Sequence, residues 1–265
     1  RLPDLSGKEP TFVSEDEYLS GNVREKLKEA MLAVENSELY RPNVEALKRV
    51  QPKDLSASEI NVRLGATWIP PEDIKDFMFE LLQTPNYCQW KMNVRFVHVT
   101  GEWYIEGKSI DKGNVKANST YGTHRVNAYR ILEDTLNLRD VRVYDYVEDE
   151  EGRKKPILNK KETAIAQGKQ DLIKQEFLNW IWKEPERRQR LTAYYNEKFN
   201  AIRPREYDGS HLKFYGMNPE IQLRQHQKNG VARIIYGGNT LLAYVVGAGK
   251  TYTMVAAAME SKRLG

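Results

Sequence analysis

The sequence predicts two fold classes in succession: a mixed α+β region of helices and β-hairpins, then the start of an α/β domain with a phosphate-binding loop. Apolar residues recur at helical spacing in several segments of the first region. Two aromatic and β-branched runs, residues 87–107 and 141–158, each surround a turn, as hairpins do. Residues 223–265 have the order helix, strand, glycine-rich turn, helix. We place the domain boundary between residues 215 and 216, within a turn-rich stretch.

Helices are expected throughout residues 1–215. Pro71 begins one of them, because proline suits the first helical position and acidic residues follow it. Thr123 is the expected cap of another, and Pro185 interrupts the last. Near its end that helix carries an apolar stripe, formed by Ile173, Phe177, Trp180 and Ile181. The expected segments are residues 15–36, 43–50, 71–83, 120–138 and 160–200.

A phosphate-binding turn is predicted next to the end of the given sequence. Gly247, Ala248 and Gly249 form a turn whose backbone N–H groups can face one anion. Lys250 begins a helix that follows an expected strand at residues 239–246, and the positive end of this helix points at the same place. Lys250 offers a charge to the β- and γ-phosphates, and the Thr251 hydroxyl is a ligand for Mg²⁺. The alternative is a glycine-rich turn followed by Lys-Thr by chance.

The helix ahead of this loop carries a candidate base-recognition residue. Gln227 lies on a basic helix just after Arg224. A glutamine amide can pair with both the N6 amino group and N7 of adenine. We therefore expect Arg224 and Gln227 to belong to the nucleotide site and Gln227 to favour ATP over GTP. A glutamine on a basic helix is otherwise usually only solvated.

The segment "LRQHQKNGV…LLAYVVGAGKT" resembles the opening of Swi/Snf-type superfamily-two DNA translocases of the DEAD/DEAH-like group. The likeness is closest to the helicase-like proteins of bacterial conjugative plasmids, integrative elements and phages. Stretches such as "RLGATWIP" and "YDGSHLKFYGMNP" also look like the region that precedes the helicase in these proteins. The resemblance implies the truncated start of a RecA-like motor, double-stranded DNA as partner, and an adenine-specific methylase upstream in the parent polypeptide.

The sequence also departs from that family. Tyr244 occupies a position where the strict phosphate-loop pattern has glycine, although helicases tolerate other residues there. Residues 1–265 contain neither the acidic second motif, nor arginine fingers, nor an "NPPY"-type methylase motif. We therefore expect the site to begin a motor that continues beyond residue 265, and these residues alone not to hydrolyse ATP. The alternative is a non-catalytic scaffold or DNA-docking module that joins a methylase to a motor.

The composition and one basic cluster bear on the compartment and the partners of the protein. The formal net charge is +4 and the pI about 8.9, which tolerates a polyanionic partner without requiring one. No apolar run could cross a bilayer, and Cys88 is the single cysteine, so a bacterial cytoplasm is expected. A low-weight candidate for DNA binding lies around Pro185, where bases could stack on tryptophan while cations hold phosphates; its alternative is an ordinary core and a solvated helix face. This cluster comprises Trp182, Lys183, Arg187, Arg188 and Arg190.

Overall fold

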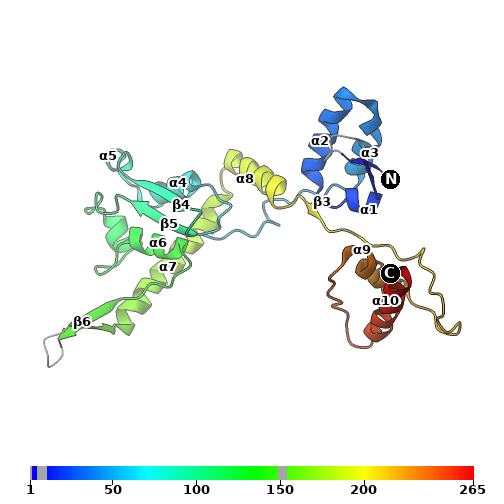
Figure 1. Ribbon diagram of the computed structural model, residues 1–265. Coiled ribbons are helices and arrows are strands. Elements are labelled where there is room, and N and C mark those ends of the chain that lie inside the picture. Colours follow the sequence, from blue (N-terminus) through cyan, green and yellow to red (C-terminus); the bar gives the residue numbers. More distant parts are fainter. Residues whose placement is uncertain (1, 5–10, 149–153) are drawn as a thin grey trace. The chain divides into compact units, whose positions relative to one another are not determined.

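The computed structural model describes residues 2–4, 11–148 and 154–265, and its chain divides into two compact units. The central unit is Asp54–Asn200, and the terminal unit combines Arg1–Lys53 with Ala201–Gly265. The secondary structure is a mixture of helices and four separate two-stranded antiparallel sheets in the described part of the chain (Figure 1). The boundary expected at residues 215 and 216, and the motor class of the C-terminal fold, stay predictions.

The N-terminal part of the terminal unit is a small helical cluster with two short sheets. Strand β1 (Leu2–Asp4) pairs with β2 (Thr11–Val13), and β3 (Gly21–Asn22) pairs with β8 (Ile202–Arg203). Helices α1 (Glu15–Tyr18), α2 (Val23–Asn36) and α3 (Arg41–Arg49) and the 3₁₀ turn η1 (Glu38–Tyr40) complete it. Its core is made by buried apolar residues, chiefly Leu2, Tyr18, Leu19, Val23, Ala30 and Leu47.

The single helix expected at residues 15–36 is wrong, because the chain breaks between α1 and α2. Gly21 has a φ of 77°, a conformation that a helix does not use. Asn22 then caps α2 by accepting the Glu25 N–H at 3.1 Å. Asn22 also pairs with Ile202 in the β3–β8 sheet. The long-range strand pairing and the local cap together end the first helix and begin the second.

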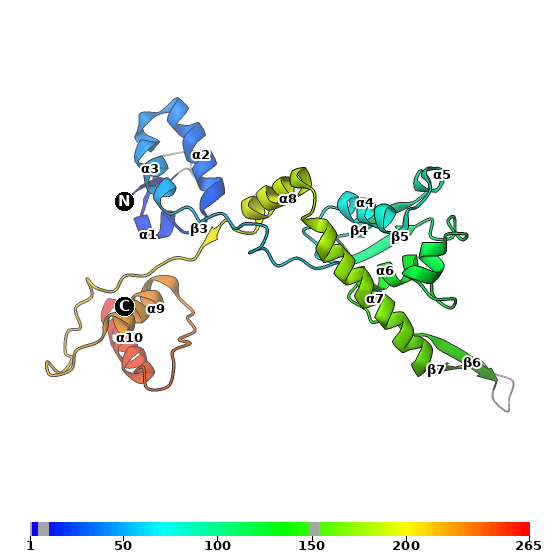
Figure 2. The ribbon, with the colours of Figure 1, turned by 180° about the vertical axis from the view of Figure 1, so that it is seen from behind.

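The central unit has one core, built from helices on a β-hairpin. Helix α4 (Pro71–Leu82) and helix α6 (Ala128–Leu136) both contact the hairpin of β4 (Asn93–Val97) and β5 (Glu102–Glu106). The long helix α7 (Lys160–Ile181) packs against α4 and α6 and leads into α8 (Pro185–Lys198) (Figure 2). The remaining elements are α5 (Asn86–Gln89), the π-helical turn η2 (Lys116–Thr120), β6 (Tyr144–Glu148) and β7 (Lys154–Leu158).

Most expected elements of the central unit are confirmed, with two corrections. Residues 86–89 are helical and precede the hairpin instead of joining it. Asn127, not Thr123, caps α6: its side chain accepts the Arg130 N–H at 3.0 Å. Thr123 closes the preceding turn, where its hydroxyl accepts the N–H groups of residues 125 and 126. The tip of the expected second hairpin, residues 149–153, lies outside the described residues.

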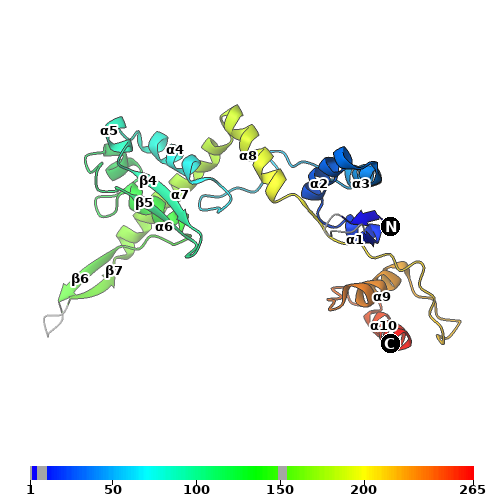
Figure 3. The ribbon, with the colours of Figure 1, turned by 45° about the horizontal axis from the view of Figure 1, so that its top comes forward.

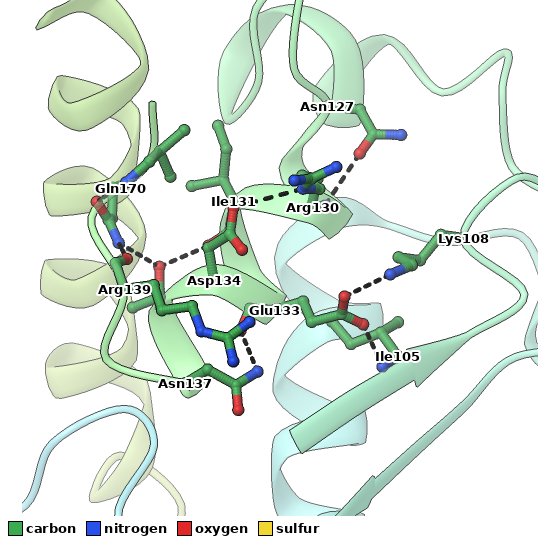
Figure 4. A network of polar contacts seen from close by, with 12 residues as sticks. Ile105, Lys108, Asn127, Arg130, Ile131, Glu133, Asp134, Asn137, Arg139 and Gln170 are labelled. Carbon is green, nitrogen blue, oxygen red and sulfur yellow. Dashed lines mark hydrogen bonds and ion pairs between the residues drawn. The ribbon is translucent and has the colours of Figure 1, made fainter. Parts of the chain in front are cut away.

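Side chains of α6 cover the free edge of β5 (Figure 4). Glu133 accepts the Ile105 N–H at 2.7 Å. Asn137, directly after α6, bonds both the N–H and the carbonyl of Trp103 at 2.9 Å. An uncovered strand edge would leave these backbone groups without partners. The contacts seat α6 on the hairpin, with Trp103 only 2% exposed.

Gln170 of α7 hydrogen-bonds to the end of α6 and to the chain that follows it. Its amide nitrogen donates to the Thr135 hydroxyl at 3.1 Å and to the Arg139 carbonyl at 2.8 Å (Figure 4). Its amide oxygen accepts the Val141 N–H at 3.3 Å. Because Gln170 is only 3% exposed, no water replaces these bonds in the folded state.

Gln170→Ala is expected to destabilise the central unit by about 1–3 kcal/mol, because it leaves buried backbone groups unsatisfied. Urea unfolding followed by tryptophan fluorescence measures the change. Gln175→Ala, on the exposed side of the same helix, is the matched control and is expected to stay near wild type. Equal stability of the two variants would show that the Gln170 contacts contribute nothing.

The C-terminal part of the terminal unit is a helix pair. Helix α9 (Gln225–Gly237) packs against α10 (Lys250–Leu264) through Leu223, Val231, Ala256 and Ala257. The strand expected at residues 239–246 is not formed; this segment runs without a strand partner among the described residues. A β-strand needs a hydrogen-bonded neighbour, which the apolar sequence of this segment cannot supply by itself. Within the described residues, no helix is long and apolar enough to span a bilayer.

Candidate nucleotide-binding loop

Gln227 lies at the first turn of α9 and is held on both sides. Its side-chain oxygen accepts the Arg224 N–H at 2.8 Å, which closes the start of the helix. Its amide nitrogen lies 3.4 Å from the Ala248 carbonyl oxygen and 3.3 Å from that of Gly249. Gln227 is 6% exposed, whereas the Arg224 side chain is exposed and contributes only its backbone to this contact. Gln227 therefore connects α9 to the candidate loop.

The loop itself requires glycine at two positions. Gly247 and Gly249 have φ values of 84° and 80°, in the left-handed region that side chains disfavour. A Cβ atom on Gly249 would also come within 2.2 Å of the Gln227 amide nitrogen. The glycines thus permit the sharp turn into α10 and the close approach of Gln227.

Lys250 is the first residue of α10, as the sequence predicts. Its ammonium group donates to the carbonyl oxygens of Tyr244 at 2.8 Å and Val245 at 3.2 Å. Thr251, next on the helix, has an exposed side chain. The first N–H groups of a helix have no acceptor within that helix, so an anion can bind to them. The loop therefore presents a cation, a hydroxyl and free amides at one place.

Sequence reasoning missed three side chains that support the loop. The Tyr244 hydroxyl donates to the His226 carbonyl at 2.8 Å, and the His226 ring lies 3.0 Å from the Ala248 carbonyl oxygen. The buried Thr253 hydroxyl donates to the Gly249 carbonyl at 3.3 Å. Tyr244 packs where α9 has Gly230, and a Cβ atom there would lie 2.6 Å from the Tyr244 hydroxyl oxygen. In the sequence, Gly230 on the helix and Tyr244 in place of the usual glycine were the two residues that could have indicated this packing.

The basic cluster around Pro185 is partly committed to internal contacts. The Arg187 guanidinium lies 3.4 Å from the Trp180 ring centroid and donates to two backbone carbonyls at the end of α7. Arg190 forms a bidentate pair with Asp73, which is 3% exposed. Lys183 and Arg188 are exposed, and Trp182 is half-buried. DNA binding by this cluster stays a prediction, with Arg187 and Arg190 serving to hold α8 in place.

Comparison with known proteins gives one family and one distant relative. The model of the family described as "Domain of unknown function (DUF8437)" matches residues 63–201, more than half of the chain. The "Defense against restriction protein B" of Escherichia phage P1 is 33% identical over 99 residues. That alignment covers 36% of this chain and 4% of the phage protein. No solved structure matches the chain significantly.

These findings correct the resemblance to Swi/Snf-type translocases, which is wrong. The family that matches is not described as a helicase family, and it occupies the residues taken to precede a helicase. The same site chemistry recurs on unrelated folds, so the residues of a phosphate loop indicate a chemistry and not a family. Similarity to a phage protein does support the expected mobile-element setting.

Proposed function

Since the chain belongs to the DUF8437 family, whose description assigns no activity, we propose its function from its own residues: residues 224–251 bind ATP with Mg²⁺. The observation that carries this is the placement of Lys250 at the first residue of α10, directly after two glycines with positive φ. A bound triphosphate places its oxygens against the first amides of α10. Similarity to a phage protein supports a role in a phage or another mobile element.

Each loop residue has a defined task in this proposal. In the structure, carbonyl oxygens hold the Lys250 ammonium group. Phosphate oxygens carry more negative charge than carbonyl oxygens, so Lys250 turns to the β- and γ-phosphates when ATP binds. Thr251 supplies its hydroxyl to Mg²⁺, and Gly247, Ala248 and Gly249 supply the backbone around the phosphates.

We further propose that a longer protein containing this chain uses ATP for work on DNA, as a helicase or translocase. The phosphate loop and the net positive charge support this, independently of any family likeness. The alternative is a docking module, in which the loop binds nucleotide but drives no reaction. DNA-stimulated ATP hydrolysis by the longer protein, abolished by Lys250→Ala, separates the two.

Saturation-transfer difference NMR tests nucleotide binding directly, because it detects weak ligands. With the 265-residue chain and Mg²⁺, saturation transfer to the adenine and ribose protons of ATP is expected. Excess pyrophosphate should remove the signal by competing for the loop. Absence of transfer at millimolar ATP would overturn the proposed site.

Gln227 distinguishes base recognition from loop positioning. If its amide reads adenine, Gln227→Ala lowers ATP affinity while GTP affinity stays unchanged. If its contacts with residues 248 and 249 dominate, both affinities fall together, by about tenfold for the removal of one or two hydrogen bonds. The geometry favours the second outcome, because the amide is already engaged by Arg224 and the loop. Competition NMR with ATP and GTP measures the difference.

A further inference from the structure

An arginine-lined cavity lies in the central unit, whereas the candidate loop belongs to the terminal unit. Its volume is about 420 Å³, which falls within the range of about 300–1,000 Å³ common for ligand sites. Its polar lining includes Arg125 and Asn127, just before α6, and Arg130 and Asp134 within α6. Arg142, Tyr144 and Tyr146 line it from the chain that leads into and along β6.

The backbone periodicity turns Arg142 and both tyrosines to one side. Val141 and Val143 are 1% and 4% exposed, and their N–H groups donate to side chains of α7. Successive side chains of an extended chain point to opposite faces. The side chains of the two valines are therefore buried in the core, and those of Arg142, Tyr144 and Tyr146 lie on the opposite face, at the cavity. In Figure 3 the β6–β7 hairpin projects beyond the start of α7.

The charges of the three arginines are not equally available. Arg125 pairs with Asp145 at 2.9 Å and donates to the Tyr144 carbonyl at 2.9 Å. Arg130 lies 3.5 Å from Asp134, one turn further along α6 (Figure 4). Arg142 has no ion pair or hydrogen-bond partner among the residues that the structure describes. The N-terminal end of α6 adds a partial positive charge at Asn127. Arg142 is thus the cation of the cavity that no described residue pairs with.

We propose that this cavity binds a phosphate group of a nucleic acid strand, with Arg142 as its main contact. A guanidinium group matches two phosphate oxygens at once. Tyr146, whose side chain is 69% exposed, offers a face on which a neighbouring base stacks. A free phosphate ion needs no such aromatic surface, so the observations favour a strand.

Fluorescence anisotropy with a labelled oligothymidine tests the proposal on the full 265-residue chain at low salt. Arg142→Glu is expected to weaken binding at least about tenfold. It should also reduce the slope of log affinity against log salt concentration by about 0.7 for each phosphate that the protein no longer neutralises. Tyr146→Ala is expected to weaken it about tenfold. The matched control is Lys91→Glu, an equal charge change at an exposed residue between α5 and β4 of the same unit, for which less than about a twofold change is expected, because a single surface charge outside the cavity is largely screened. Thermal melts check that all variants fold.

The outcomes are distinct. Specific weakening by Arg142→Glu and Tyr146→Ala supports a strand in the cavity. Weakening by Arg142→Glu alone, together with displacement of the strand by micromolar pyrophosphate, keeps the phosphate site but identifies a free anion as its ligand. Equal weakening by Arg142→Glu and Lys91→Glu, or no binding by wild type, overturns the proposal. Arg142→Ala repeats the test without introducing a repelling charge.

Discussion

Lys250→Ala is expected to weaken ATP binding by about 12- to 150-fold, which makes the binding of ATP to a weak site undetectable. Hydrogen bonds to charged groups contribute about 1.5–3 kcal/mol, and Lys250 is the cation that the loop offers to the phosphates. The substitution leaves the fold intact, because alanine favours helices and Lys250 bonds only the Tyr244 and Val245 carbonyls. Saturation-transfer difference NMR with ATP and Mg²⁺ measures the decrease.

Lys262→Ala is the matched control for this prediction. Lys262 is exposed in the last turn of α10, so the same change in charge occurs far from the loop along that helix. We expect saturation transfer to ATP to survive in this variant. Full ATP binding by Lys250→Ala would falsify the assignment of residues 247–251 as the phosphate site.

Phe77→Ala is expected to destabilise the central unit by about 3–5 kcal/mol, the usual cost of removing a buried phenylalanine. Phe77 is 1% exposed, and its ring centroid lies 5.1 Å from that of Phe177 and 5.4 Å from that of Trp180. The cavity left behind would remove contacts between α4 and α7. Because a domain of this size has about 5–15 kcal/mol of stability, the substitution brings the unit close to unfolding.

The tryptophans make this measurement specific. All five of them lie within Asp54–Asn200, so urea unfolding followed by tryptophan fluorescence reports the central unit alone. Phe199→Ala is the control, because Phe199 is 53% exposed and its removal leaves no enclosed cavity. ATP binding by the terminal unit is expected to persist in Phe77→Ala. If ATP binding disappeared in this variant at low denaturant, the two units would not fold independently.

Local sequence patterns predicted several elements correctly. Pro71 begins α4 and Pro185 begins α8, since proline disrupts a helix everywhere but in its first turn. The apolar stripe at the end of α7 is buried, because helical periodicity places those side chains on one face. The glycines before Lys250 marked the turn into α10, since positive φ values are open to glycine at low cost.

The other features depend on residues far apart in the sequence. The pairing of Asn22 with Ile202 splits the first expected helix, and residues 239–246 form no strand because a strand needs a neighbour. Arg190, a DNA candidate in the sequence, is also the partner of Asp73 through a contact that spans 117 positions. By itself the sequence determined where prolines begin helices, which residues of α7 are apolar, and where glycines precede Lys250. The tertiary structure alone decided which caps, strands and charges are used, because partner atoms from distant segments satisfy them.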